Sequence, residues 1–208
     1  VMLDFMAQIK NETGHILKEL NLGGGFGIKY IPENDPAPYR SYMQKVSNVV
    51  HQVCKDKDLA LPYVIIEPGR SVVGPAGITL YTVGAVKEIP NIRTYVSIDG
   101  GMTDNPRYIL YGSKYDAVVA NRADQPRESV ITLAGRCCES GDLIGENMSI
   151  QTPEVGDVVA VLATGAYNYA MASNYNRNPR PAVVMVNNGT DRLIVRRESL
   201  EDLVRNDI

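Results

Sequence analysis

Hydrophobic residues near the start of the chain recur at the spacing of a helix. Phe5, Ile9, Ile16 and Leu17 follow this spacing, and a short apolar run at residues 20–22 comes next, immediately before a cluster of glycines. The pattern predicts a helix, then a short strand, then a loop.

A second helix and a second strand are indicated further along. Ser41 with Gln44 three residues later is typical of a capping box. The apolar stripe that follows it consists of Met43, Val46, Val50, Val53 and Cys54. The β-branched run at residues 63–66 is typical of a strand buried on both faces. Residues 1–77 therefore alternate helix, strand, helix, strand, helix, which favours a parallel α/β arrangement.

After residue 77 the pattern changes to short runs rich in Val, Ile, Thr and Tyr, which are typical of antiparallel strands. These runs lie at residues 78–89, 93–98, 116–120, 128–134, 157–163, 182–187 and 190–196. Residues 187–190 carry an Asn-Asn-Gly-Thr hairpin signal. Helices are expected only at residues 166–172 and at the C-terminus, where Ser199 and Asp202 indicate a capping box. The pattern predicts a β-barrel or sandwich.

Composition narrows the functional classes. Of the 208 residues 44% are hydrophobic, so the chain can bury a substantial core. Acidic residues outnumber basic ones 24 to 21, which argues against binding to nucleic acid or anionic lipid. No apolar run reaches the roughly 18 residues that a membrane span needs. The three cysteines, Cys54, Cys137 and Cys138, indicate neither a disulfide framework nor a metal site, and a cytoplasmic location is expected. The chain begins at Val1 without a start methionine, so we expect a truncated form of a longer protein.

Two motifs at predicted strand ends favour a phosphate site. Residues 23–27 form a glycine cluster, and missing Cβ atoms let backbone N–H groups approach an anion. Residues 67–70, Glu-Pro-Gly-Arg, leave the next strand one α/β repeat later. In a (β/α)₈ barrel the loops after the last two strands commonly form a phosphate site. The alternatives are a flexible turn for the glycines and a structural ion pair for Glu67 and Arg70.

Two later motifs carry charged and reactive side chains. Arg107 with Tyr111 four residues beyond it suits bidentate capture of a carboxylate, although a plain polar loop has the same composition. Residues 137–142 bring together thiols, two carboxylates and a hydroxyl. A cysteine there can donate a proton to a carbanion, whereas the alternative is a small buried cysteine without a catalytic role. Tyr167, Tyr169 and Tyr175 could stack on an aromatic ligand or belong to the core.

These motifs in order resemble the diaminopimelate decarboxylase family over nearly the whole chain. They read GGGFG, EPGR, DGGMTDNPR, CCESGD and GAYNYAMASNYN. The family belongs to the alanine-racemase-like class of pyridoxal-phosphate enzymes. The resemblance implies the C-terminal part of a (β/α)₈ barrel at residues 1–77 and an antiparallel β-domain at 78–208. It also implies decarboxylation of meso-2,6-diaminopimelate to L-lysine, the last step of lysine biosynthesis.

The resemblance also implies roles for particular residues. Those expected at pyridoxal 5'-phosphate are Gly24, Gly25, Gly27, Glu67, Gly69, Arg70 and Tyr167. Those expected at the substrate are Arg70, Arg107, Tyr111, Glu139, Ser140 and Tyr167. Glu67 would face the pyridine nitrogen, and Cys138 would be the catalytic acid that reprotonates the α-carbon. In the family the cysteine loop reaches into the partner subunit's active site, so a homodimer is implied.

One expected residue has no counterpart in the chain. The family carries its Schiff-base lysine in a Tyr-Ala-x-Lys-Ala context near the start of its barrel, and no such context occurs here. Lys10, Lys18 and Lys29 do not match it, and His15 and His51 do not replace the family's cofactor-stacking histidine. We therefore expect the chain to be inactive alone.

Other readings remain open at this point. Ornithine and arginine decarboxylases belong to the same class, but their substrates lack the distal carboxylate that Arg107 would bind. Carboxynorspermidine decarboxylase is harder to exclude, because its substrate also carries a carboxylate. A homologue without catalytic activity that regulates a partner by dimerising with it would also lack the lysine, and a plain β-domain binding module is a third alternative.

Overall fold

The computed structural model describes residues 1–208 and divides into two compact units, each described here by itself. Unit 1 consists of Val1–Lys29 and Asn34–Val72, and unit 2 consists of Tyr30–Glu33 and Val73–Ile208. The domain limits inferred from the sequence, 1–77 and 78–208, remain predictions about the intact protein. No helix of the chain is long and apolar enough to cross a bilayer.

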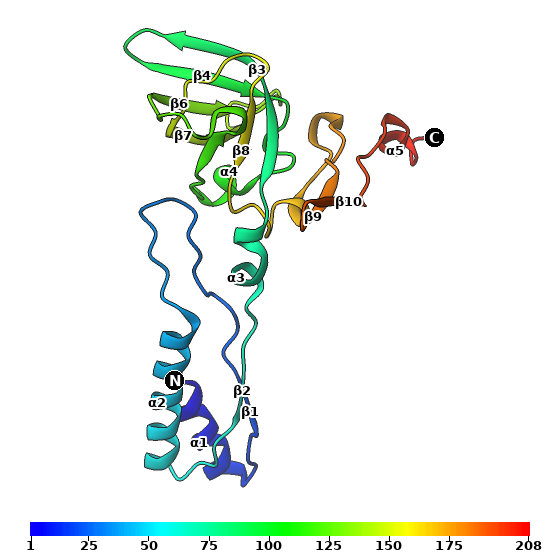
Figure 1. Cartoon of the computed structure of the whole chain (residues 1–208). Coiled ribbons are helices and arrows are strands. Elements are labelled where there is room, and N and C mark those ends of the chain that lie inside the picture. The colour runs from blue at the N-terminus through cyan, green and yellow to red at the C-terminus, as the bar shows by residue number, and fades with distance from the viewer. The chain divides into compact units, whose positions relative to one another are not determined.

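Unit 1 has the predicted alternation of helices and strands (Figure 1). Its elements are α1 (Met2–Thr13), β1 (Glu19–Asn21), α2 (Tyr39–Asp56), β2 (Tyr63–Ile65) and, except for its last residue, α3 (Gly69–Val73). β1 and β2 pair in parallel, with Leu20 opposite Val64, which confirms the predicted parallel arrangement. α1 ends at Gly14, whose φ of 73° is a left-handed conformation that glycine adopts without strain.

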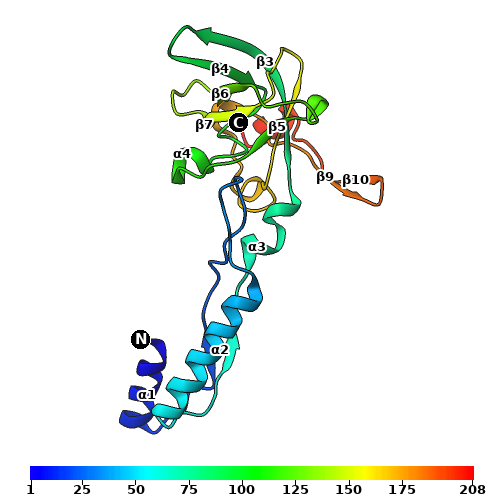
Figure 2. The same cartoon turned by 60° about the vertical axis from the view of Figure 1, so that its left-hand side comes forward.

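The core of unit 1 lies where α1, α2 and β1 meet. α1 and α2 lie side by side in both views of the chain (Figures 1 and 2). The buried cluster consists of Leu3, Met6, Leu20, Val50 and Cys54. Cys54 is only 2% exposed, and burial raises the pKa of its thiol. Cys54 is thus a small buried residue of this core.

Two expectations for unit 1 are wrong. Ser41 is not a helix cap: α2 begins two residues earlier, after Pro38, and Ser41 lies inside its first turn with its N–H donated to the Pro38 carbonyl oxygen. The proline ring holds φ at −62° and so defines the helix start without a side-chain cap. β2 is a strand, but its three residues are exposed, because the parallel sheet of this unit contains only β1 and β2.

Unit 2 is built on a six-stranded sheet that nearly closes into a barrel. The strands are β3 (Thr79–Ile89), β4 (Arg93–Ile98), β5 (Ala117–Val119), β6 (Ser129–Ala134), β7 (Leu143–Ile150) and β8 (Val158–Val161). Their order is β5-β8-β3-β4-β6-β7. The edge strands β5 and β7 contact each other, and the Gln151 side chain accepts a hydrogen bond from the Val119 N–H at 3.0 Å. The sheet domain therefore curls around an enclosed core.

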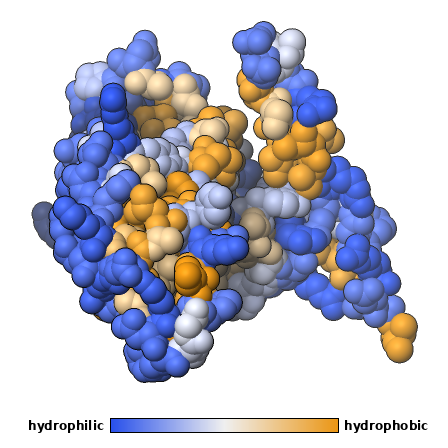
Figure 3. Space-filling model, turned by 90° about the horizontal axis from the view of Figure 1, so that it is seen from below, coloured by the Kyte–Doolittle hydropathy of each residue, from blue (hydrophilic) through white to orange (hydrophobic).

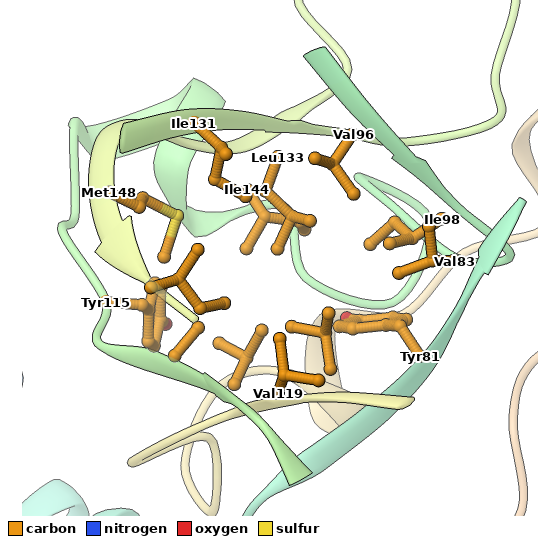
Figure 4. Packing of buried hydrophobic residues seen from close by; sticks show 14 residues of the cluster. Tyr81, Val83, Val96, Ile98, Tyr115, Val119, Ile131, Leu133, Ile144 and Met148 are labelled. Atoms are coloured by element: carbon orange, nitrogen blue, oxygen red, sulfur yellow. The ribbon is translucent and has the colours of Figure 1, made fainter. Parts of the chain in front are cut away.

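The core of unit 2 is the interior of this sheet. Side chains from all six strands point inward, among them Val83, Val96, Val119, Ile131 and Ile144 (Figure 4). Most of these side chains are fully buried and apolar. The alternation of inward and outward positions along each strand produces this core.

Three expectations for unit 2 need correction. β7 was not predicted, because Gly145, Glu146 and Asn147 interrupt its apolar pattern and the ladder to β6 contains register shifts. β4 pairs with β6 in parallel, whereas only antiparallel pairs were expected. The helix predicted at residues 166–172 is a single 3₁₀ turn, η3 (Tyr169–Met171), after Tyr167 adopts a φ of 64°.

The remaining predictions for the last part of the chain are confirmed. β9 (Val183–Asn187) and β10 (Thr190–Val195) form an antiparallel hairpin whose turn residues Asn188 and Gly189 have positive φ. α5 (Leu200–Val204) has the predicted capping box between Ser199 and Asp202. Outside the core many hydrophobic side chains are exposed, and Figure 3 shows such side chains among polar ones on one face.

Candidate functional site

The two predicted phosphate motifs lie side by side in unit 1. Because β1 and β2 are parallel, the loops that leave their carboxyl ends start at the same edge. The Leu22 N–H donates to the Ile65 carbonyl oxygen at 2.9 Å, and the Glu67 N–H donates to the Gly23 carbonyl oxygen at 2.8 Å. The structure therefore brings the start of the glycine cluster against the start of the Glu-Pro-Gly-Arg motif.

Glycine is needed here for close approach of two backbones. A Cβ at Gly24 would lie 2.4 Å from the Glu67 carbonyl oxygen, a distance that real Cβ atoms do not adopt. Gly23 and Gly25 have φ values of 68° and 86°, which other residues rarely adopt. The loop is thus a cradle of exposed backbone that a side chain at Gly24 would force open. Gly27 has more room, since a Cβ there would only touch Pro36 at 3.4 Å.

Asn21 joins the two motifs and was missed by the sequence reasoning. Its side-chain amide donates to Glu67 Oε1 at 2.7 Å, and its Oδ1 accepts the Gly23 N–H at 2.8 Å. One side chain therefore orients the Glu67 carboxylate and fixes the first turn of the glycine loop. The available signal was an asparagine at the last position of a strand, two residues before the glycines.

The Glu-Pro-Gly-Arg motif continues into the short helix α3. The helix begins at Gly69, whose N–H donates to the Glu67 carbonyl oxygen at 2.9 Å, and Arg70 follows in its first turn. Gly69 and Arg70 therefore follow Glu67, the residue against which Gly24 lies, by two and three residues.

Unit 2 places Arg107 among tyrosine rings. Arg107 is the first residue of α4 (Arg107–Tyr111) and is 7% exposed. Its guanidinium carbon lies 5.4 Å from the ring centre of Tyr111, 5.7 Å from that of Tyr167 and 6.0 Å from that of Tyr30. Its Nη2 atom donates to the Ser113 hydroxyl at 3.2 Å. Three of the predicted residues, Arg107, Tyr111 and Tyr167, are thus brought together.

The charge of Arg107 has no carboxylate partner in the chain. It makes no ion pair, and its buried Nε atom has no hydrogen-bond partner. Leaving a buried charge unpaired is unfavourable, so an anion placed beside this guanidinium would be stabilising. The cluster is therefore suited to a carboxylate ligand.

The cysteine loop, residues 137–142, presents three of its side chains to solvent. Cys138 and Glu139 are exposed, as is Ser140, whereas Cys137 is partly buried. Burial and the neighbouring Asp142 carboxylate raise the pKa of Cys137 to about 11, so its thiol stays protonated. Of the two cysteines, Cys138 is therefore the one that can reach a ligand.

Asp142 ties the cysteine loop to the loop that precedes Arg107. Its carboxylate accepts the Met102 N–H at 2.6 Å and the Cys137 N–H at 2.7 Å. A Cβ at Gly101 or at Gly135 would lie within 2.4 Å of this carboxylate, so both positions need glycine. Asp142 was predicted only as part of a reactive cluster. The structure buries it as the link between the two motifs.

The sequence reasoning also missed a buried pair, Tyr81 and Asp104, at the loop that precedes Arg107. The Tyr81 hydroxyl donates to Asp104, which in addition accepts the Gly101 N–H at 3.0 Å. Burial raises the pKa of Asp104 and raises that of Tyr81 well above its usual value. The pair therefore helps to fix the turn at residues 100–104. No sequence signal connected Asp104 with Tyr81, because the two residues are 23 positions apart in the chain.

Comparison with known proteins identifies both units. The pyridoxal-binding domain of the pyridoxal-dependent decarboxylases matches residues 2–74, and their C-terminal sheet domain matches residues 63–165. The diaminopimelate decarboxylase of Bacillus subtilis is 48% identical over 199 residues, which cover 96% of this chain and 45% of that protein. The chain thus spans about half the length of the curated relatives it matches.

Solved structures agree with these matches. The diaminopimelate decarboxylase of M. jannaschii in complex with L-lysine has a TM-score of 0.89 and 35% identity, over 99% of this chain and 46% of that one. The Helicobacter pylori enzyme, also with L-lysine, has a TM-score of 0.82 and 30% identity, over 98% of this chain and 48% of that one. The two domain matches together run from residue 2 to residue 165, and the relatives are similar over nearly the whole chain. The chain therefore belongs to the pyridoxal-dependent decarboxylase family.

Proposed function

We propose that the complete protein decarboxylates meso-diaminopimelate to L-lysine and releases carbon dioxide. The observation that carries the proposal is the close approach of Gly24 to the Glu67 backbone. It places a glycine loop suited to binding phosphate beside the Glu67 carboxylate, which Asn21 orients. The similarity to diaminopimelate decarboxylases, including two solved with L-lysine, supports this substrate and product.

Pyridoxal 5'-phosphate fits the residues at the strand ends. Gly24, Gly25 and Gly27 offer backbone to the phosphate, and a side chain at Gly24 would fill that space. Gly69 and Arg70 would complete the phosphate site, with Tyr167 against the cofactor. When bound, the cofactor supplies an electron sink for the bond to carbon dioxide.

Glu67 would hold a proton on the pyridine nitrogen of the cofactor. A carboxylate beside that nitrogen favours its protonated form. Asn21 donates to Glu67 Oε1 at 2.7 Å, so the second oxygen, Oε2, would be the one to interact with the pyridine nitrogen. Asn21 thereby limits the rotation of the carboxylate and keeps its charge in place.

The substrate's far end would be bound by charges of both signs. Diaminopimelate ends in a carboxylate and an ammonium, whereas ornithine and arginine end in a cation alone. Arg107 suits the carboxylate and Glu139 suits the ammonium, with Tyr111 and Ser140 beside them and Arg70 at a substrate carboxylate. This pairing favours diaminopimelate over ornithine or arginine. Carboxynorspermidine is a second candidate substrate, because Arg107 would bind its carboxylate too.

Cys138 would return a proton to the α-carbon after carbon dioxide has left. Its exposure supports this role, since a proton donor must reach the substrate. We propose that it does so across the interface of a homodimer, with Cys138 and Glu139 of one subunit serving the site of the other.

A cytoplasmic location and a Schiff-base lysine outside these 208 residues belong to the same proposal. The alternative of a non-catalytic partner predicts no turnover by the complete protein.

The first test compares the complete protein with the 208-residue chain. Both are supplied with pyridoxal phosphate and diaminopimelate, carbon dioxide release is measured, and borohydride is used to fix any lysine-bound pyridoxyl group. The complete protein should turn over, and the 208-residue chain should neither turn over nor carry a pyridoxyl group, because none of its lysines has the family's sequence context. Turnover with stoichiometric pyridoxyl on a lysine of the short chain would contradict this.

A substitution of Arg107 tests the substrate assignment. In the complete enzyme Arg107→Ala should lower kcat/KM for diaminopimelate far more than for an analogue without the distal carboxylate. Losing a charged hydrogen bond costs about 1.5–3 kcal/mol. Arg192→Ala, an exposed arginine on β10, is the matched control and should change neither value. Equal losses for both compounds would show that Arg107 does not bind that carboxylate.

A further inference from the structure

The backbone of the cysteine loop is held by hydrogen bonds at three successive N–H groups. The Cys137 N–H donates to Asp142 Oδ2 at 2.7 Å, the Cys138 N–H to Asn176 Oδ1 at 2.8 Å, and the Glu139 N–H to the Cys137 carbonyl oxygen at 2.8 Å. Of these three acceptors only Asn176 comes from a distant part of the chain. We propose that Asn176 is a positioning residue that fixes Cys138 for proton donation, an inference that rests on the proposed function.

The backbone conformation of Asn176 favours this contact. It lies in η4 (Tyr175–Arg177) with a φ of 52°, a left-handed conformation in which asparagine is favoured over most residues. Arg177 follows with a φ of 56°. Two successive residues in this region cost free energy, which the surrounding contacts must offset. The conformation directs the side-chain oxygen to the Cys138 N–H.

The neighbours of Asn176 contact the same loop. Asn178 Nδ2 lies 3.5 Å from Cys137 Sγ, and the Tyr175 hydroxyl lies 3.5 Å from Glu139 Oε2. Residues 175–178 therefore touch three consecutive residues of the loop, each through a different side chain. This makes the segment a support for the loop and for both of its proposed functional side chains.

The supporting segment is itself anchored. Asn174 Nδ2 donates to Glu198 Oε2 at 2.6 Å and to the Asn178 carbonyl oxygen at 3.0 Å. Glu198 also accepts the Arg180 N–H at 2.8 Å and the Arg180 Nε–H at 2.9 Å. A support fixed at both ends can hold the loop in one place.

The loop is also held by Asp142, whose carboxylate accepts both the Cys137 N–H and the Met102 N–H. Cys138 and Glu139 are exposed, so the packing of their own side chains does not fix them. Their position depends on the backbone contacts, and Asn176 supplies the contact at Cys138 itself. A displacement of about 1 Å at a reacting group can lower a rate by about 100-fold.

Three variants of the complete enzyme separate the hydrogen bond from the backbone conformation. Asn176→Gly keeps the positive φ and removes the acceptor oxygen. Asn176→Asp keeps an acceptor oxygen at the same place. Asn188→Gly, in the hairpin turn, is the matched control, because Asn188 has a φ of 49° and is exposed. The test measures kcat and KM of each variant. It also measures amide hydrogen exchange in peptides that cover residues 135–141 and 129–134.

Asn176→Gly should lower kcat by about 10-fold to 100-fold and change KM little, because Cys138 acts after the substrate has bound. Exchange should become faster at residues 135–141 and stay unchanged in β6. Asn176→Asp should keep slow exchange and most of kcat, and Asn188→Gly should match the unsubstituted enzyme.

Two results would overturn the inference: kcat of Asn176→Gly within about two-fold of the unsubstituted value, or equal losses for Asn176→Asp and Asn176→Gly. Failure of the proposed function is a separate result, because the unsubstituted enzyme would then show no turnover of diaminopimelate.

Discussion

Mixing two differently inactivated forms of the complete enzyme is expected to restore about a quarter of its activity. One form carries Cys138→Ala, and the other carries a substitution of the Schiff-base lysine. Random exchange of subunits makes half of the dimers mixed, and each mixed dimer has one site with both groups intact. The exposure of Cys138 in the single chain supports a role in a partner's site. The measurement is carbon dioxide release after subunit exchange has been demonstrated by native mass spectrometry.

The control is a mixture in which both forms carry Cys138→Ala, since no exchange can then create an intact site. It should remain as inactive as its components. If the first mixture exchanges its subunits fully and still recovers no activity, then Cys138 and the lysine act within one subunit, and the shared site is wrong.

Gly24→Ala should lower the affinity of the complete enzyme for pyridoxal phosphate by about ten-fold to a hundred-fold. The new Cβ would lie 2.4 Å from the Glu67 carbonyl oxygen, so the glycine loop and the Glu67 loop must separate. Forcing an extra carbon into a closely packed place costs about 1–3 kcal/mol, and every 1.4 kcal/mol is about ten-fold in affinity. Titration of the substituted protein with cofactor, followed by absorbance, measures the loss.

Gly14→Ala is the matched control in the same unit. Gly14 has a φ of 73° at the end of α1, and no atom lies within 4 Å of a Cβ built there. The substitution should cost about 1 kcal/mol of folding free energy and leave cofactor affinity unchanged. If Gly24→Ala binds the cofactor as tightly as the unsubstituted enzyme does, the glycine loop does not form the phosphate site.

The sequence was most informative where local chemistry decides structure. Gly189 in the β9–β10 turn needs a positive φ, and Ser199 caps α5 with its own hydroxyl, so both features follow from neighbouring residues. Predictions failed where contacts overrode the pattern. Ser41 looked like a cap, but Pro38 already defines the start of α2. β7 lacks a regular alternation because its ladder to β6 is irregular.

Which residues form the candidate site was largely predictable, whereas what holds them was not. Gly24, Glu67, Arg107 and Cys138 stand in motifs that the sequence displays, because their chemistry depends on residue type and short spacing. The residues that orient them act at long range. Asp142, for example, hydrogen-bonds the Met102 N–H across 40 residues of sequence.

The sequence by itself indicated the change from an α/β pattern to a β pattern, the family, and the motifs that contain the candidate site residues. Each of these depends on periodicity or on motifs whose residues are close together along the chain. Only the tertiary structure decided that Asn21 hydrogen-bonds Glu67, that Arg107 lies among tyrosine rings and that the Cys138 N–H donates to the Asn176 side chain. The physical reason is that a hydrogen bond depends on distances of about 3 Å and on direction, and both are set by the packing of strands and loops remote in sequence.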